Sequence, residues 1–195
     1  PHTPVEAKSN LVAHYEKKSS SQMHHRNAAY AAMVQSLEES VGRLLARIEE
    51  RKPADRTVVI FTSDNGGYLQ DSTGVNITDN FPLRSGKGAL YEGGIRVPLI
   101  VRWPGVTPTG EVCQEPVVST DLYKTLLEMA GLKTIEPSDD GVSIVPLLRS
   151  PTAHLARTAL YFHYPHYYPT TTPVSAVREG DLKLIEFLED NRVEL

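Results

Sequence analysis

Two short segments of the sequence carry side chains suited to chemistry on an anion. The segment Thr62-Ser63-Asp64-Asn65-Gly66-Gly67 places a carboxylate beside an amide, directly after the apolar run 58–61. Lys87 lies 23 residues after Asp64 and stands between two glycines. Because glycine has no side chain, the Lys87 ammonium group can approach an anion closely. Oxygen donors alone suit a hard cation such as calcium or magnesium. The two segments therefore predict a cation site and an anion contact.

Each candidate residue also has an ordinary structural interpretation. Asp-Asn-Gly-Gly is a common turn sequence, and most lysines are simply solvated. His2 has the side chain of an acid or base near neutral pH, but a histidine between prolines is more often structural. His163 and His166, in the aromatic stretch 161–168, suit the lining of a sugar pocket and suit packing between two subdomains equally well. Residue type and spacing leave these alternatives open.

Composition narrows the class of protein and of partner. With 195 residues, of which 40% are hydrophobic, the chain can bury a sizeable core as one domain, or as one domain with a small appendage. A net charge of -4 without a dense basic run argues against nucleic-acid binding, and no apolar stretch approaches the roughly 18 residues of a membrane span. The single cysteine, Cys113, lacks a nucleophile motif and is interpreted as an inert thiol. Oligomeric state has no readable signal.

The elements expected to position the candidates alternate between helix and strand. Apolar residues at helical spacing from Tyr30 to Ile48 predict a helix that ends before Pro53. Residues 57–61 and 99–103 read as strands buried on both faces. Between them, residues 63–96 carry seven glycines without a clear period, which predicts a long loop of the kind that is often functional.

A further helix follows these strands, and then the sequence changes to strand-like runs. Ser119 or Thr120 can cap a helix that ends at Gly131, and its apolar face comprises Leu122, Leu126, Met129 and Ala130. Beyond residue 151, strand-like runs occur at 158–162, 174–178 and 182–187, and Glu179-Gly180-Asp181 is a plausible hairpin connection. We therefore expect an α/β part over residues 1–150 and a small antiparallel β subdomain over residues 151–195.

Several segments, taken in order along the chain, resemble a known family. Residues 62–67, 82–88 and 91–98 are similar to the second half of a type I sulfatase of the alkaline-phosphatase-like superfamily. Pro1-His2-Thr3-Pro4 resembles the segment that carries the family's active-site histidine. Residues 140–148 and 176–185 resemble later landmarks of the family. The resemblance spans nearly the whole chain and implies part of an alkaline-phosphatase-like sandwich with a mixed or parallel sheet.

The resemblance implies a reaction and a role for each candidate. In this family a formylglycine, made from a Cys or Ser, attacks a sulfate ester while a calcium ion neutralises the sulfate oxygens. By position, Asp64 and Asn65 would be calcium ligands, and Lys87 would contact the sulfate and the ester oxygen. His2 would contact the sulfate and assist proton transfer. His163 and His166 are candidates for contact with a sulfated carbohydrate or aryl substrate from their residue types alone, not from the resemblance. Many relatives are exported to the periplasm, the extracellular space or the lysosome.

The chain also departs from the family pattern. The nucleophile motif needs a Cys or Ser with Pro or Ala two positions on and Arg four positions on, and no Cys or Ser here satisfies it. The family's leading pair of metal-binding aspartates is absent too. We expect a piece of a longer sulfatase that is inactive alone and binds calcium weakly or not at all.

Two alternatives to a sulfatase remain. One is a phosphoesterase of the same superfamily, which normally uses two transition metals, and the other is a sulfatase-like protein that binds sulfated glycans without turnover. Lys87 stands where a single-metal sulfatase would want a cation, which favours sulfate. An intact nucleophile motif upstream would favour catalysis over binding.

Overall fold

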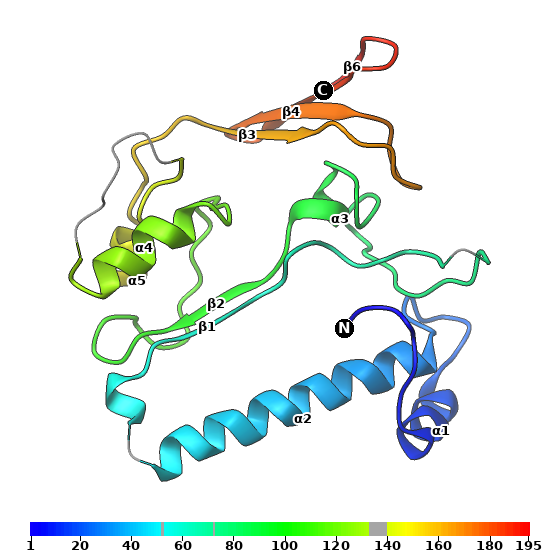
Figure 1. Cartoon of the computed structure of the whole chain (residues 1–195), viewed down its shortest axis with the longest axis horizontal. Helices are drawn as coiled ribbons and strands as arrows, with labels where there is room; N and C mark the ends of the chain where they lie inside the picture. Colours follow the sequence, from blue (N-terminus) through cyan, green and yellow to red (C-terminus); the bar gives the residue numbers. More distant parts are fainter. Residues whose placement is uncertain (52, 72, 133–139) are drawn as a thin grey trace. The chain divides into compact units, whose positions relative to one another are not determined.

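The computed structural model describes residues 1–51, 53–71, 73–132 and 140–195. Two compact units each gather stretches that are far apart in the sequence. Unit 1 comprises Pro1–Ala54, Asn65–Val97 and His166–Thr172, and unit 2 comprises Asp55–Asp64, Pro98–Pro165 and Pro173–Leu195. The architecture is α/β, as expected, with the elements labelled in Figure 1. The domain boundary expected at residue 150 stays a prediction.

Unit 1 contains two helices and the glycine-rich loop. Helix α2 (Ala28–Glu50) confirms the expected helix and begins after Asn27, whose side chain accepts a hydrogen bond from Tyr30 N at 2.9 Å. Its apolar stripe is only partly covered, since Ala32 is the one buried residue of α2 and Leu44 is 62% exposed. Helix α1 (Ser9–Lys18) was not expected, and none of its residues is fully buried. Within the loop, a short helix α3 spans Glu92–Ile95.

Unit 2 contains a two-stranded antiparallel sheet. Strands β1 (Val59–Thr62) and β2 (Leu99–Arg102) lie side by side in Figure 1, with Phe61 opposite Ile100. An antiparallel pair is compatible with a mixed sheet and not with a purely parallel one. The expectation that both strands are buried on both faces is wrong, because Phe61 is 37% and Ile100 61% exposed.

A second sheet in unit 2 confirms the expected antiparallel β structure near the carboxyl end. The strands pair in the order β3-β4-β5-β6, with bounds Ala159–Tyr164, Val174–Glu179, Leu182–Phe187 and Arg192–Glu194. Gly180 has φ +55 in the β4–β5 connection, a conformation that glycine adopts without steric cost. Alternate residues bury one face of the sheet: Leu160, Val174, Ala176, Ile185 and Phe187. This alternation is typical of an antiparallel sheet with one face on a core.

Helix α4 (Asp121–Met129) of unit 2 occupies the expected position, but its buried residues are polar. Asp121 and Thr125 are fully buried, whereas Leu126, expected on the apolar face, is 50% exposed. Thr120 is the N-cap residue, yet its side chain makes no capping hydrogen bond. The carboxylate of Asp121 instead accepts the backbone N–H of Val118 at 2.9 Å. Gly131 ends the helix with φ +69, as expected of a left-handed carboxyl-terminal residue.

The apolar core of unit 2 gathers around a short helix. Helix α5 spans Val145–Arg149, and a 3-10 turn at Ala54–Arg56 precedes β1 in the sequence. Ile144, Leu147 and Leu155 form a buried cluster against which Leu99 of β2 packs. Among the described residues, no helix combines the length and the apolar character that crossing a membrane requires.

Candidate functional site

Asp64 and Asn65 follow two and three residues after the carboxyl end of β1. The division between the units falls between them, so Asp64 ends a stretch of unit 2 and Asn65 begins a stretch of unit 1. The Asn65 side chain donates from Nδ2 to the Gly66 carbonyl at 2.8 Å, which fixes the orientation of its amide. A carboxylate and an amide therefore stand on consecutive residues just after a strand.

Glycines allow the backbone after Asn65 to lie directly against the chain near α3. Gly66 N–H donates to the Gly94 carbonyl at 2.8 Å. A Cβ atom on Gly66 would lie 1.8 Å from the Gly93 carbonyl oxygen, and a Cβ on Gly93 would lie 2.1 Å from the Ser85 carbonyl oxygen. Because backbone fills these spaces, no side chain fits at either position. The glycines of both sequence segments thus form one packed arrangement in unit 1.

Asn80 ties the turn that carries Lys87 to the turn that follows Asn65. Its Nδ2 donates to the Gly67 carbonyl at 3.1 Å and to the Ser85 carbonyl at 2.9 Å. Lys87 N–H donates to the same Gly67 carbonyl at 3.0 Å. Ser85 has φ +64, a left-handed conformation that a residue with a side chain seldom adopts. Hydrogen bonds on the Gly67 and Ser85 carbonyls stabilise this turn and so hold the backbone of Lys87.

The side chains of Lys87 and His2 meet, although 85 residues separate them in the sequence. Lys87 Nζ lies 2.8 Å from His2 Nε2, and both side chains are reachable by solvent. His2 Nδ1 lies 3.2 Å from the Thr3 carbonyl oxygen, which can only accept a hydrogen bond. His2 Nδ1 also lies 3.1 Å from Thr3 Oγ1. Because a lysine ammonium group can only donate, Nε2 is the acceptor in the contact with Lys87. The pair therefore presents an ammonium group held against an imidazole nitrogen.

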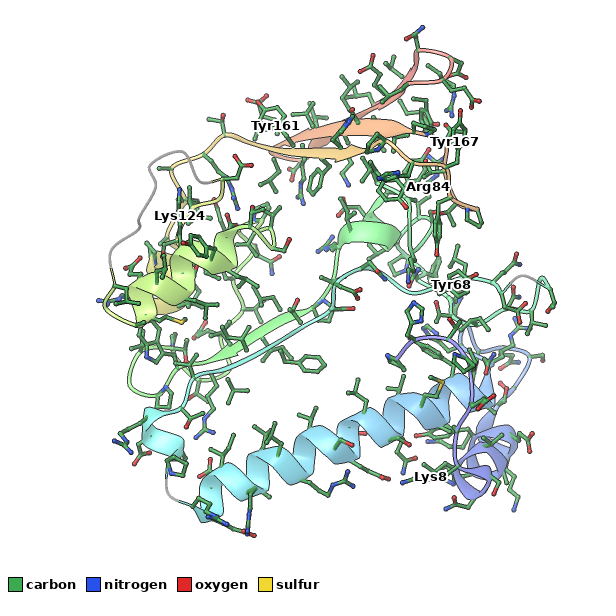
Figure 2. All side chains as sticks on the ribbon, in the orientation of Figure 1. Lys8, Tyr68, Arg84, Lys124, Tyr161 and Tyr167 are labelled. Atoms are coloured by element: carbon green, nitrogen blue, oxygen red, sulfur yellow. The ribbon has the colours of Figure 1, made fainter. Side chains whose placement is uncertain are left out.

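The remaining candidates divide between the units. His166 belongs to unit 1, together with His2, Asn65 and Lys87. His163 belongs to unit 2, where its Nδ1 lies 2.8 Å from Ser175 Oγ of the neighbouring strand. It shares the exposed face of β3 with Tyr161, which is labelled in Figure 2. The structure thus brings His2 to Lys87 directly and holds His163 by a hydrogen bond within the sheet.

Sequence reasoning missed two residues that hold the Lys87 turn. Asn80 and Thr170 hydrogen-bond to backbone carbonyls of residues 67, 85 and 87. Neither residue type suggests chemistry by itself, because asparagine and threonine are ordinary loop residues. Asn80 does stand two residues before the segment 82–88. That proximity was the one signal that could have identified it.

The donor set near β1 fits part of a site for a hard cation. Asp64 and Asn65 offer a carboxylate and an amide oxygen on consecutive residues. Calcium takes about six to eight oxygen ligands. Over residues 1–51, 53–71, 73–132 and 140–195, no group of three or more His, Cys, Asp or Glu side chains is arranged to hold a metal ion. The residues fit calcium by their chemistry and need further ligands to hold it.

Comparison with protein families gives two overlapping matches. The family model described as Sulfatase matches residues 1–132, and the model described as N-sulphoglucosamine sulphohydrolase, C-terminal, matches residues 85–195. A sulfatase of Formosa agariphila is 37% identical over the whole of this chain. The chain covers 37% of that relative's length.

Two solved structures extend the comparison. One is a protein solved in complex with its substrate D-glucosamine-2-N,6-O-disulfate, which is 28% identical to this chain with a TM-score of 0.72. The match covers 95% of this chain and 38% of the solved chain. The phosphonate monoester hydrolase of Silicibacter pomeroyi is 25% identical, with a TM-score of 0.65, over 85% of this chain and 33% of its own. The alkaline-phosphatase-like fold expected from the motifs is thereby confirmed. Motifs, architecture and family matches agree, and the chain belongs to the sulfatase family.

Proposed function

We propose that the whole protein that carries this chain hydrolyses sulfate esters, and that Lys87 and His2 act on the sulfate group. The observation that carries the proposal is the 2.8 Å contact between Lys87 Nζ and His2 Nε2. An ammonium group has three N–H donors, so a Lys87 that directs one to His2 keeps two for an anion. Membership of the sulfatase family supports sulfate as that anion.

The two side chains suit the step in which the ester bond breaks. Negative charge then develops on the departing oxygen, and a cation held beside that oxygen lowers the barrier. Lys87 holds its charge at the site and can donate a proton to the departing alkoxide. His2, whose Nε2 lies 2.8 Å from Lys87 Nζ, orients the ammonium group and assists the proton transfer.

A calcium ion and a formylglycine complete the proposal. Asp64 and Asn65 would supply part of a calcium coordination sphere, and calcium neutralises charge on sulfate oxygens. A formylglycine formed outside this chain would be the nucleophile. The oxygen chemistry of Asp64 and Asn65 supports the metal, and the family match supports the formylglycine. We also expect the whole protein to be exported, on the strength of the family resemblance.

We propose a sulfated carbohydrate as the substrate class, with an aryl sulfate as a small-molecule alternative. The relative solved with D-glucosamine-2-N,6-O-disulfate supports a sugar. On this proposal His163 and His166 contact the sugar. Aromatic and imidazole side chains provide the stacking and hydrogen bonds by which sugar rings are recognised.

A phosphoesterase is the second candidate, because one structural relative is a phosphonate monoester hydrolase. Phosphate and phosphonate esters present a similar tetrahedral anion to the same residues. Lys87 stands where a single-metal sulfatase would want a cation, which favours sulfate over phosphate. A sulfatase-like protein that binds sulfated glycans without turnover is the third.

The proposal is tested by comparing substrates in the whole protein. We expect 4-nitrophenyl sulfate to be hydrolysed with a higher kcat/KM than 4-nitrophenyl phosphate or a phenylphosphonate monoester. Lys87→Ala should lower kcat/KM for the sulfate by about 100-fold or more, because a cation at the developing charge is lost. Lys124→Ala, on helix α4, is the matched control and should leave kcat/KM unchanged. Preference for the phosphonate, or turnover unaffected by Lys87→Ala, would refute the proposal.

A further inference from the structure

The turn over residues 168–171 contacts the backbone that carries Lys87. Thr170 Oγ1 donates a hydrogen bond to the Lys87 carbonyl oxygen at 2.7 Å, although the two residues are 83 positions apart. Thr170 is half-buried in this position. The segment 166–172 belongs to the same compact unit as Lys87 and His2. A residue from a late part of the sequence therefore holds the residue proposed to bind sulfate.

A second contact falls on the next residue of the same backbone. A Cβ atom on Gly88 would lie 2.2 Å from Tyr168 Cδ1 and 2.7 Å from its Cγ. Gly88 also has φ +90, which residues with side chains rarely adopt. The Tyr168 ring can lie on the main chain at this point only because residue 88 is glycine. Thr170 and Tyr168 thus contact two consecutive residues, Lys87 and Gly88.

The turn itself is held in a defined conformation. Tyr168 N–H donates to the Thr171 carbonyl, and Thr171 N–H donates to the Tyr168 carbonyl, both at 2.9 Å. Pro169 occupies the first corner, where its ring fixes φ near the value that common turns require. Thr170 is the second corner, so the turn fixes the direction in which its side chain leaves the backbone. Such an arrangement loses little conformational entropy when the hydroxyl bonds to Lys87.

The contact completes the set of interactions around Lys87. The N–H of Lys87 donates to the Gly67 carbonyl at 3.0 Å, and its Nζ lies 2.8 Å from His2 Nε2. Thr170 engages the one other polar group, the carbonyl. We propose that the turn Tyr168–Thr171 is a positioning element for Lys87, and that the Thr170 hydroxyl group fixes where its ammonium group meets His2. The proposal rests on the proposed function only for its effect on turnover.

Three variants of this chain test the positioning role without any assay of activity. Thr170→Val replaces the hydroxyl group by a methyl group, Thr170→Ser keeps the hydroxyl group, and Thr171→Val removes a neighbouring hydroxyl group that bonds to Thr172 O within the segment. The measurement is hydrogen exchange of the backbone amides of residues 87–89, and circular dichroism checks that each variant is folded. Losing one hydrogen bond from the turn should raise exchange in Thr170→Val by about tenfold. Thr170→Ser and Thr171→Val should stay within about twofold of the parent chain.

Two exchange results would overturn the proposal. One is unchanged exchange in Thr170→Val. The other is an equal rise in Thr170→Val and Thr171→Val, which would mean that the segment loosens without a specific effect on Lys87. Should Thr170→Val not fold, the proposal is decided by Thr170→Ala, which also lacks the hydroxyl group and is expected to show the same rise.

Turnover by the whole protein gives the second readout. Thr170→Val should lower kcat for 4-nitrophenyl sulfate by about tenfold with little change in KM, since a displaced Lys87 affects the transition state more than substrate binding. Thr170→Ser should restore kcat. Raised exchange in a protein without sulfatase activity would refute the proposed function and leave the positioning role supported. A kcat that is equal in Thr170→Val and the parent protein would refute a role in catalysis.

Discussion

Lys87 is held through its backbone as well as its side chain, and glycines make this possible. Gly66, Gly67, Gly86 and Gly88 each lie where a Cβ atom would meet another residue within 2.6 Å. Chain segments can approach this closely only when no side chain stands between them. At the scale of single residues, the chemistry of Lys87 therefore depends on neighbours that contribute no functional group.

Substituting Gly66 tests this dependence. Gly66→Ala would place its Cβ atom 1.8 Å from the Gly93 carbonyl oxygen, so the two backbone segments must separate. We expect roughly 2 kcal/mol or more of lost unfolding free energy. Gly42→Ala is the control: it lies in α2 with nothing within 4 Å of the added atom, and it should stabilise the chain by about 1 kcal/mol. Urea denaturation measures both, and a Gly66→Ala chain as stable as its parent would contradict the packing argument.

Helix α4 shows how one polar side chain organises an element. Asp121 accepts hydrogen bonds from the backbone N–H groups of Val118 and Val142, both at 2.9 Å. Arg157 donates to both of its carboxylate oxygens, each at 2.7 Å. Burial by itself raises the pKa of Asp121, but the hydrogen bonds and charge of Arg157 with the two backbone donors outweigh it and lower the pKa. The carboxylate links the start of α4, the chain before α5 and the chain before β3.

Removing the Asp121 carboxylate should destabilise unit 2. Asp121→Asn leaves Arg157 without its ion-pair partner in a site where the Asp121 side chain is fully buried. Breaking a buried pair on one side costs about 3–5 kcal/mol, and we expect a loss of that order at pH 7. Glu128→Gln, at an exposed position of α4, should change the free energy of unfolding by less than about 0.5 kcal/mol. Urea denaturation checks both, and similar losses in the two variants would be inconsistent with this account.

The lowered pKa of Asp121 also predicts how stability depends on pH. A carboxyl group whose pKa is lower in the folded state contributes stability that is present above the ordinary pKa of 3.8. That stability is lost as the pH falls through the lower folded value. Urea midpoints measured from about pH 5 to pH 2 should fall for the parent chain and fall less steeply for Asp121→Asn. Parallel curves for the two chains would show that Asp121 does not contribute.

At the scale of the whole molecule, the chain carries part of the residues proposed for a sulfatase site. The chain spans about a third of the length of the relatives that it matches. It covers 37% of one sulfatase and 38% of one solved chain. Each compact unit is assembled from distant stretches of this chain. The contacting residues His2 and Lys87 both belong to unit 1. The proposed metal ligands Asp64 and Asn65 fall on either side of the division between the two units.

We expect the 195-residue chain to bind calcium weakly and to lack turnover. Asp64 supplies one carboxylate and Asn65 one amide oxygen, well short of the six to eight ligands that calcium takes. No Cys or Ser in the chain satisfies the nucleophile motif. Calorimetry should show no binding at micromolar calcium, and 4-nitrophenyl sulfate should remain intact. Micromolar affinity, or turnover that Lys87→Ala abolishes, would contradict this expectation.

The sequence by itself determined the family, the positions of helix α2, strands β1–β5 and helix α4, and the candidates Lys87 and His2. These follow from local signals, namely side-chain period, glycine and proline placement, and motifs in a fixed order. The domain boundary and the roles of His2, Asp64, Asn65, Lys87, His163 and His166 stay predictions.

Tertiary structure decided the features that depend on residues far apart in the chain. These include the contact between His2 and Lys87 and two hydrogen bonds to backbone carbonyls. Asn80 donates to the Ser85 carbonyl, and Thr170 donates to the Lys87 carbonyl. The tertiary structure also placed polar residues at the fully buried positions of α4, because the carboxylate of Asp121 is satisfied by Arg157, 36 positions away. The physical reason is the same throughout: hydrogen bonds and close packing between distant segments leave no periodic pattern in the sequence, and only the folded backbone brings their partners within reach.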